Sequence, residues 1–159
     1  MLFSRINRSN PEKVFIVVYN SYATASLTNG QPVMWDYATD ADGVGVTLNA
    51  VGTGRAGHYG TAVAGMAAET IASGAYGLIQ VYGYHSAARV RTATGGNPAI
   101  AAGTGLALVT NTVFCLESYA AAAAATSTIT LHNAQWCGFA LEAQASWTTK
   151  AVKVFLKCL

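Results

Sequence analysis

The sequence predicts an all-β fold, and three observations support this prediction. Short segments rich in Val, Ile, Thr and aromatic residues recur along the 159 residues. Clusters of Gly, Asn, Asp and Pro separate these segments, and no amphipathic helix stands out. We therefore predict a small antiparallel β-barrel or β-sandwich of about ten strands with extended termini. Residues 1–12 are expected to form an N-terminal arm, and residues 13–159 a single β domain.

The first predicted strands lie between clear turn signals. Lys13 to Tyr19 is an almost continuous apolar segment, and Asn29-Gly30 ends the segment that follows it. Gln31 to Asp36 and Val44 to Leu48 are predicted strands on either side of the turn Asp40-Ala41-Asp42-Gly43. Clustered carboxylates can bind calcium, but the EF-hand spacing and its terminal Glu are missing. We therefore interpret this segment as a turn capped by Asp side chains.

The middle of the chain has the clearest strand pattern. Thr61 to Ala67, Leu78 to Tyr82 and Ala87 to Thr92 are predicted as neighbouring antiparallel strands, with Gly83 in the turn between the last two. A short helix over Val63 to Ile71 is the alternative for the first of them, because small and apolar residues recur there at helical intervals.

Further strands are predicted in the last third of the chain. They cover Leu106 to Leu108, Val113 to Leu116, Thr126 to Leu131, Gln135 to Leu141 and Thr149 to Leu156. In the last of these, apolar residues alternate with lysines, which is typical of a strand with one buried face. This strand could close the domain's own sheet or pair with the edge of a neighbouring molecule.

The composition points to a protein that works in an assembly. Only 10% of the residues are charged, against about 25% in an ordinary soluble domain, and 52% are hydrophobic. A surface this poor in charge is coated with small polar residues or is covered by neighbouring subunits. The composition therefore favours an assembled structural protein.

The charged residues are also unevenly distributed. Near the two ends six cationic side chains accompany one carboxylate, whereas between Val14 and Thr149 three cationic side chains accompany six carboxylates. The six cationic residues near the ends are Arg5, Arg8, Lys13, Lys150, Lys153 and Lys157. Basic ends on an acidic body suit docking onto an acidic neighbour, either another protein or a second copy. The alternative is that these charges only solubilise short tails.

No catalytic, metal-binding or cofactor-binding constellation is found in the sequence. Gly52 to Gly57 has the glycine spacing of a dinucleotide-binding loop, but no helix pattern follows it. The three histidines and three cysteines are widely spaced: His58, His85, His132, Cys115, Cys137 and Cys158. We predict that the cysteines are small buried hydrophobic residues. We therefore expect no enzymatic activity, no metal and no cofactor.

Nucleic acids and membranes are not expected as partners either. No predicted face concentrates Lys and Arg together with aromatic residues. Val14 to Tyr19, the longest early apolar run, is too short to span a bilayer. Met1 to Asn10 lacks the apolar region of a secretory signal, so synthesis in the cytoplasm is expected.

One cluster of aromatic and cationic residues is a candidate contact surface. It contains Tyr76, Tyr82, Tyr84, His85, Arg89 and Arg91. Such a cluster could form a subunit contact or a sugar-binding shelf, and the alternative is ordinary packing between neighbouring strands.

Two segments carry a resemblance to a known family. Thr61 to Gly83 has a strand with an apolar-Gly-apolar step, a turn of small residues and a second strand that ends in Gly, and Ile100 to Leu106 adds an Ala-Ala-Gly turn. Together they resemble the small β-rich capsid decoration, or cement, proteins of tailed bacteriophages. The resemblance implies a β-barrel or sandwich that oligomerises on the outside of an icosahedral head and carries no active site. This chain differs from the shortest cement proteins in its longer N-terminal strand region and its alanine-rich loop.

The composition favours a structural protein, and the resemblance implies one on the outer surface of a capsid that stabilises the assembled head lattice. The partners that the resemblance implies are the major capsid protein and copies of this chain, as a homo-oligomer such as a trimer. A carbohydrate- or receptor-binding virion module and a self-assembling shell or tube subunit are the alternatives. The candidate interface residues are Arg5, Arg8, Lys13, Tyr82, Tyr84, Arg89, Arg91, Lys150, Lys153 and Lys157.

Overall fold

The computed structural model describes residues 12–37, 39–40, 43–48, 63–92, 99–108, 116–118, 136–145 and 148–158. These residues form nine β-strands, and none of them lies in a helix that could cross a membrane. The strands are β1 (Lys13–Asn20), β2 (Pro32–Trp35), β3 (Gly45–Thr47), β4 (Val63–Ala67), β5 (Tyr76–Val90), β6 (Gly105–Leu108), β7 (Leu116–Ser118), β8 (Trp136–Ala140) and β9 (Lys150–Lys157). The predicted all-β class is confirmed.

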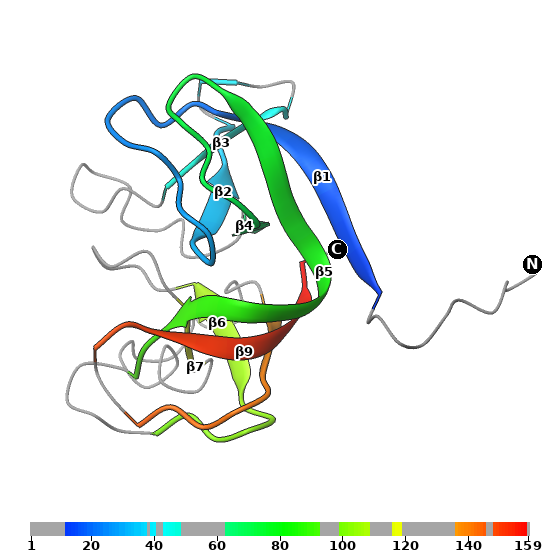
Figure 1. The fold of residues 1–159 in the computed structure, drawn as a ribbon, viewed down its shortest axis with the longest axis vertical. Helices are drawn as coiled ribbons and strands as arrows, with labels where there is room; N and C mark the ends of the chain where they lie inside the picture. The colour runs from blue at the N-terminus through cyan, green and yellow to red at the C-terminus, as the bar shows by residue number, and fades with distance from the viewer. Residues whose placement is uncertain are drawn as a thin grey trace, which may run out of the picture.

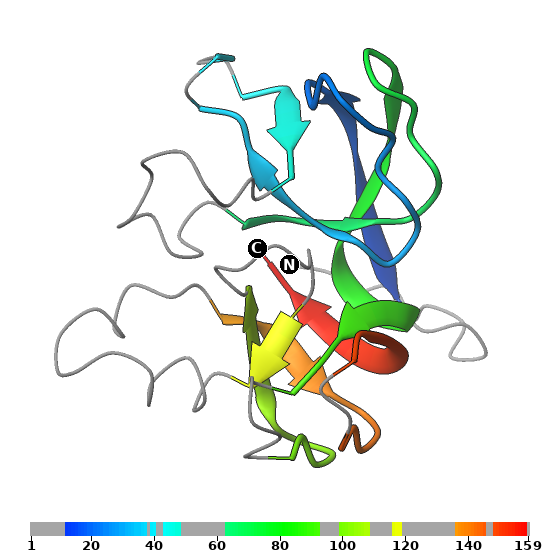
Figure 2. The ribbon, with the colours of Figure 1, turned by 90° about the vertical axis from the view of Figure 1, so that its left-hand side faces the viewer.

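The nine strands belong to one sheet that folds into two lobes, and both lobes use the long strand β5 (Figure 1). In lobe 1 the pairing runs β1–β3–β2–β4–β5, and β1 also pairs with the first part of β5. In lobe 2 it runs β5–β7–β6–β8–β9, and β9 also pairs with the second part of β5. Figure 2 shows the two lobes one above the other, with β5 passing from one into the other.

Several details of the predicted architecture differ from the structure. The sheet is mixed, because β1–β3 and β5–β7 are parallel pairs. The described residues form nine strands of one sheet, so the predicted barrel or sandwich of about ten strands is not confirmed, and the predicted strand at residues 126–131 lies outside these residues. Strand β9 pairs with β5 on one side and β8 on the other, so it closes the protein's own sheet and is not an extended terminus. Of the predicted N-terminal arm the structure describes only Glu12.

The prediction that Gly83 lies in a turn between two strands is wrong, because β5 runs through it without interruption. The main chain of Glu12 passes so close to Gly83 that a Cβ atom there would lie 2.0 Å from the Glu12 carbonyl oxygen. Gly83 also has a φ of +95°, which other residues rarely adopt. The glycine therefore marks a close approach of β1 to β5 at the junction of the lobes.

The alternative of a helix over Val63 to Ile71 is also wrong, since this segment contains β4. All five residues of β4 are buried, and they contribute to two different cores. Val63 and Met66 belong to the apolar cluster of lobe 2, whereas Ala64 and Ala67 belong to that of lobe 1. A strand buried on both faces loses the usual alternation of polar and apolar residues, which explains the helix-like spacing.

The two lobes repeat the same pattern of hydrogen bonds. Leu27 bridges to Ile71 in lobe 1, and the residues 73 positions later, Ile100 and Gln144, form the same bridge in lobe 2. The turn that follows each bridge is repeated as well, with Gly30 and Gly103 both at positive φ. Their N–H groups donate to carbonyls that are again 73 residues apart, those of Ala67 and Ala140, at 2.9 and 2.8 Å. The fold is therefore an internal repeat, which the sequence analysis missed.

A short stretch of sequence carries the trace of this repeat. Five residues between positions 65 and 73 recur 73 positions later: Gly65, Ala67, Glu69, Ala72 and Ser73 match Gly138, Ala140, Glu142, Ala145 and Ser146. The two glutamates play equivalent roles, because Glu69 accepts the Leu78 N–H and Glu142 accepts the Lys153 N–H, both at 2.9 Å. Each carboxylate thus joins the loop after β4 or β8 to the next strand.

Candidate functional site: an exposed apolar face on lobe 1

The outer surface of β1 and of the first part of β5 is apolar and exposed. Val17 lies opposite Leu78 and Tyr19 opposite Tyr76 in the antiparallel pairing, with Phe15 further along β1. The exposed fractions are 64% for Val17, 67% for Tyr76, 43% for Phe15 and 39% for Leu78. We call these five residues the lobe-1 face. Exposed apolar side chains gathered in this way mark contact surfaces, whereas single ones are common on any protein.

The inner surface of the same two strands already supplies the core of lobe 1. Val18, Ile79 and Val81 are buried there, and Val14 and Ile16 pack against them. Strand β1 is therefore apolar on both sides, although the described residues cover only one of them.

The repeat shows what the same surface looks like in lobe 2. Glu69 accepts the N–H of the residue 9 positions later, whereas Glu142 accepts the N–H of the residue 11 positions later, so lobe 2 has two extra residues before β9 and Leu78 corresponds to Lys153. On the same alignment the pair Tyr19–Tyr76 corresponds to the pair Arg89–Ala151. The Lys153 ammonium forms an ion pair with Glu142 at 3.2 Å, and this pair is exposed. The same backbone thus accepts charged and small residues at this surface. The apolar character of the lobe-1 face is consequently not required by the fold.

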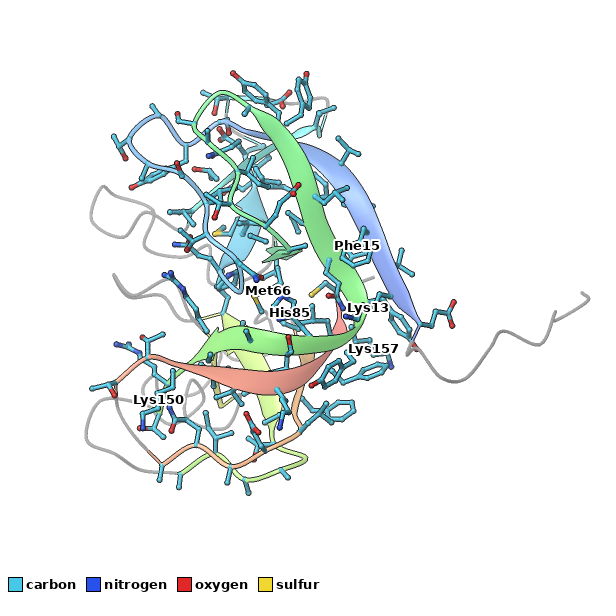
Figure 3. The ribbon with its side chains drawn as sticks, in the orientation of Figure 1. Lys13, Phe15, Met66, His85, Lys150 and Lys157 are labelled. Atoms are coloured by element: carbon cyan, nitrogen blue, oxygen red, sulfur yellow. The ribbon has the colours of Figure 1, made fainter. Side chains whose placement is uncertain are left out.

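A second feature lies where β1, β5 and β9 meet, beside the lobe-1 face. Lys13 and Lys157 are exposed there, together with Phe15 (Figure 3). The Lys13 ammonium lies 5.7 Å from the centre of the Tyr84 ring. The Tyr82 ring packs edge-on against Phe155 with 5.2 Å between ring centres. Tyr82 and Tyr84 are half-buried in these contacts, which favours cross-strand packing over an open sugar-binding shelf.

The structure brings together four of the predicted interface residues, Lys13, Tyr82, Tyr84 and Lys157, and separates the others from them. Arg89 is half-buried, and its Nη2 donates to Thr28 Oγ1 at 2.6 Å. Lys150 lies at the far end of β9 from Lys157 (Figure 3), and Lys153 pairs with Glu142 on lobe 2. Arg91 is half-buried after the end of β5, and Arg5 and Arg8 lie outside the described residues.

Hydrogen bonds hold the described part of the acidic turn after β2, whereas Ala41 and Asp42 lie outside the described residues. The Asp36 carboxylate accepts hydrogen bonds from the hydroxyl groups of Ser21, at 2.8 Å, and of Thr39. The Asp40 N–H donates to the Asp36 carbonyl at 2.8 Å. In the part of the chain that the structure describes, no group of three or more His, Cys, Asp or Glu side chains could hold a metal ion.

Two predicted buried residues can be placed. Cys137 is buried in the core of lobe 2, and Cys158 is half-buried beside it, with its Sγ 3.5 Å from the Cys137 carbonyl oxygen. The prediction of a small buried hydrophobic residue is confirmed for Cys137, whereas Cys115 lies outside the described residues.

His85 is buried between the lobes, near Met66 of β4 (Figure 3), and should make the stability depend on pH. Burial lowers the pKa of the imidazole, with a smaller opposing effect from a hydrogen bond to the Ala67 carbonyl. The unfolded chain then binds a proton at a higher pH than the folded chain does. We expect the free energy of unfolding to decrease as the pH falls below about 6.5. In urea titrations between pH 7 and pH 5, His85→Gln should show a shallower decrease than the unaltered protein. An unchanged slope would contradict this assignment.

Comparisons with known proteins find only a distant structural similarity. No family model and no curated protein matches the sequence. Among solved structures, the chain is similar to the one described as head fiber gp8.5 N base in bacteriophage phi29. The two share 12% sequence identity and a TM-score of 0.42, over 91% of this chain and 94% of that one.

Proposed function

We propose that this chain is a structural virion protein of the decoration, or cement, class, which binds the outer surface of an assembled icosahedral head without catalysis. The observation that carries the proposal is the lobe-1 face, an apolar surface that the fold itself does not need. A protein that stays bound to a lattice can keep such a face, because neighbouring subunits cover it. The low content of charged residues supports the same conclusion.

The resemblance to phage cement proteins indicates which kind of assembly this is. Its two segments correspond to β4 with the start of β5, and to the turn before β6. The likeness to the phi29 head-fiber base is too distant to add to this argument. A cement protein needs no reaction, because binding only the assembled lattice stabilises it by mass action.

Quantitative peptide mass spectrometry of purified particles tests the proposal. We expect the number of copies of this chain per major shell subunit to be near one or a simple fraction such as a third. As a control, an abundant soluble host protein is measured in the same samples before and after a salt wash. Its amount shows how much unbound protein copurifies with the particles. A few copies per particle would favour a receptor-binding part instead, and absence of the chain from particles would refute the proposal.

A further inference from the structure

The lobe-1 face carries charges of opposite sign at its two ends. At one end β1 begins, and the exposed lysines Lys13 and Lys157 lie there together with Glu12. At the other end Tyr19 lies beside Gly45 of β3. The half-buried Asp40 lies there as well, with its carboxylate in the place that a Gly45 side chain would take. The face is therefore apolar in the middle, basic at one end and acidic at the other.

We propose that this face packs against the same face of a second copy of the chain, with the two β1 strands antiparallel. In that orientation the basic end of each copy lies over the acidic end of the other, while Val17, Tyr76 and Leu78 bury one another. This surface is complementary to itself after a rotation of 180°. Such self-complementarity favours binding of a second copy over binding of an unrelated partner. This inference names one partner for the surface on which the proposed function rests.

Lobe 2 provides the variant that tests the proposal. Tyr76→Ala combined with Leu78→Lys gives lobe 1 the residues that lobe 2 has at the same places, Ala151 and Lys153. The new lysine would lie beside Glu69, as Lys153 lies beside Glu142, so the variant should fold. As a matched control, Ala151→Lys also adds one positive charge, at the exposed position of lobe 2 that corresponds to Tyr76.

Sedimentation velocity of the full chain over a range of concentrations gives the readout. We expect the unaltered protein and the Ala151→Lys control to dimerise. The dissociation constant of the double variant should be at least about 100-fold higher than that of the unaltered protein. Thermal unfolding of the double variant, measured at a concentration where every form is monomeric, should match that of the unaltered protein. A monomeric unaltered protein, or a double variant that associates normally, would overturn the proposal.

A charge exchange tests the orientation separately. Lys13→Glu and Asp40→Lys should each weaken the dimer, because each creates a repulsive pair between copies. The variant with both changes should recover association, since the new carboxylate at position 13 and the new ammonium at position 40 would again face each other across the interface. If the combined variant instead associates more weakly than either single variant, the antiparallel arrangement would be overturned.

These measurements use no particles, so their failure is distinct from failure of the proposed function. A chain that occurs on particles at a lattice-wide copy number but is monomeric in solution would leave the proposed function standing. The inferred self-association would then be wrong, and the lobe-1 face would be assigned to contact with the shell itself.

Discussion

Replacing Gly83 by alanine is expected to lower the free energy of unfolding by about 3 kcal/mol or more. Two effects combine at this position. The added Cβ would lie 2.0 Å from the Glu12 carbonyl oxygen, which is main chain and cannot rotate away. The φ of +95° adds strain for any residue with a side chain. Because Lys13 and Leu156 both pair with Gly83, from β1 and β9, the distortion would reach both lobes.

Gly103→Ala is the matched control for this prediction. Gly103 has a similar φ of +86°, but no atom lies within 4 Å of the position that a Cβ would take. Only the backbone strain remains there, so we expect a loss of about 1 kcal/mol. Chemical denaturation of both variants measures the difference. Equal losses in the free energy of unfolding would show that the close approach of β1 to β5 adds nothing to the cost of Gly83→Ala.

Replacing Asn20 by alanine should lower the free energy of unfolding by about 3 kcal/mol, because it leaves buried polar groups without partners. The Asn20 side chain is fully buried, and its Nδ2 donates to the Ile71 carbonyl at 2.9 Å. Its Oδ1 accepts the Tyr22 N–H at 3.0 Å. The side chain therefore joins the end of β1 to the loop that follows β4.

An exposed hydrogen bond to the same loop gives the comparison for Asn20. Ser73 Oγ donates to the Tyr22 carbonyl at 2.8 Å, and this bond is open to solvent. Water can replace the lost partner in Ser73→Ala, so the loss should be below about 1 kcal/mol. Urea unfolding at neutral pH compares the two variants. A loss for Asn20→Ala as small as that for Ser73→Ala would mean that the cavity admits water.

The strands of the fold were predictable where local patterns reflect a single buried face. The buried Val152, Val154 and Leu156 alternate with exposed or half-buried residues in β9, and β9 was predicted within a residue of its observed ends. Prediction of strands and turns from the sequence failed where a strand is buried on both faces or where two strands approach closely. Strand β4 contributes side chains to two cores and therefore has no alternation. A glycine such as Gly83 indicates a turn in the sequence as readily as it indicates a close approach of two chains.

The candidate surface was harder to predict than the strands. Phe15, Val17 and Leu78 look like core residues in the sequence, because hydrophobicity alone does not tell which side of a strand is covered. Basic residues received more weight, although Arg89 is half-buried and Lys153 pairs within lobe 2. A search for internal repeats would have aligned Glu69 with Glu142. Once the two extra residues that lobe 2 has before β9 are allowed for, that alignment matches Leu78 to Lys153 and reveals the contrast between the lobes.

The order of strands along the chain has a consequence for synthesis on the ribosome. All strands of lobe 1 have been made once β5 is complete at Val90, so this lobe can form while the rest of the chain is still being translated. Lobe 2 must wait for β9, which fills the gap between β5 and β8. A nascent chain that stalls before Lys150 would present two open strand edges, which are sites for aggregation or chaperone binding.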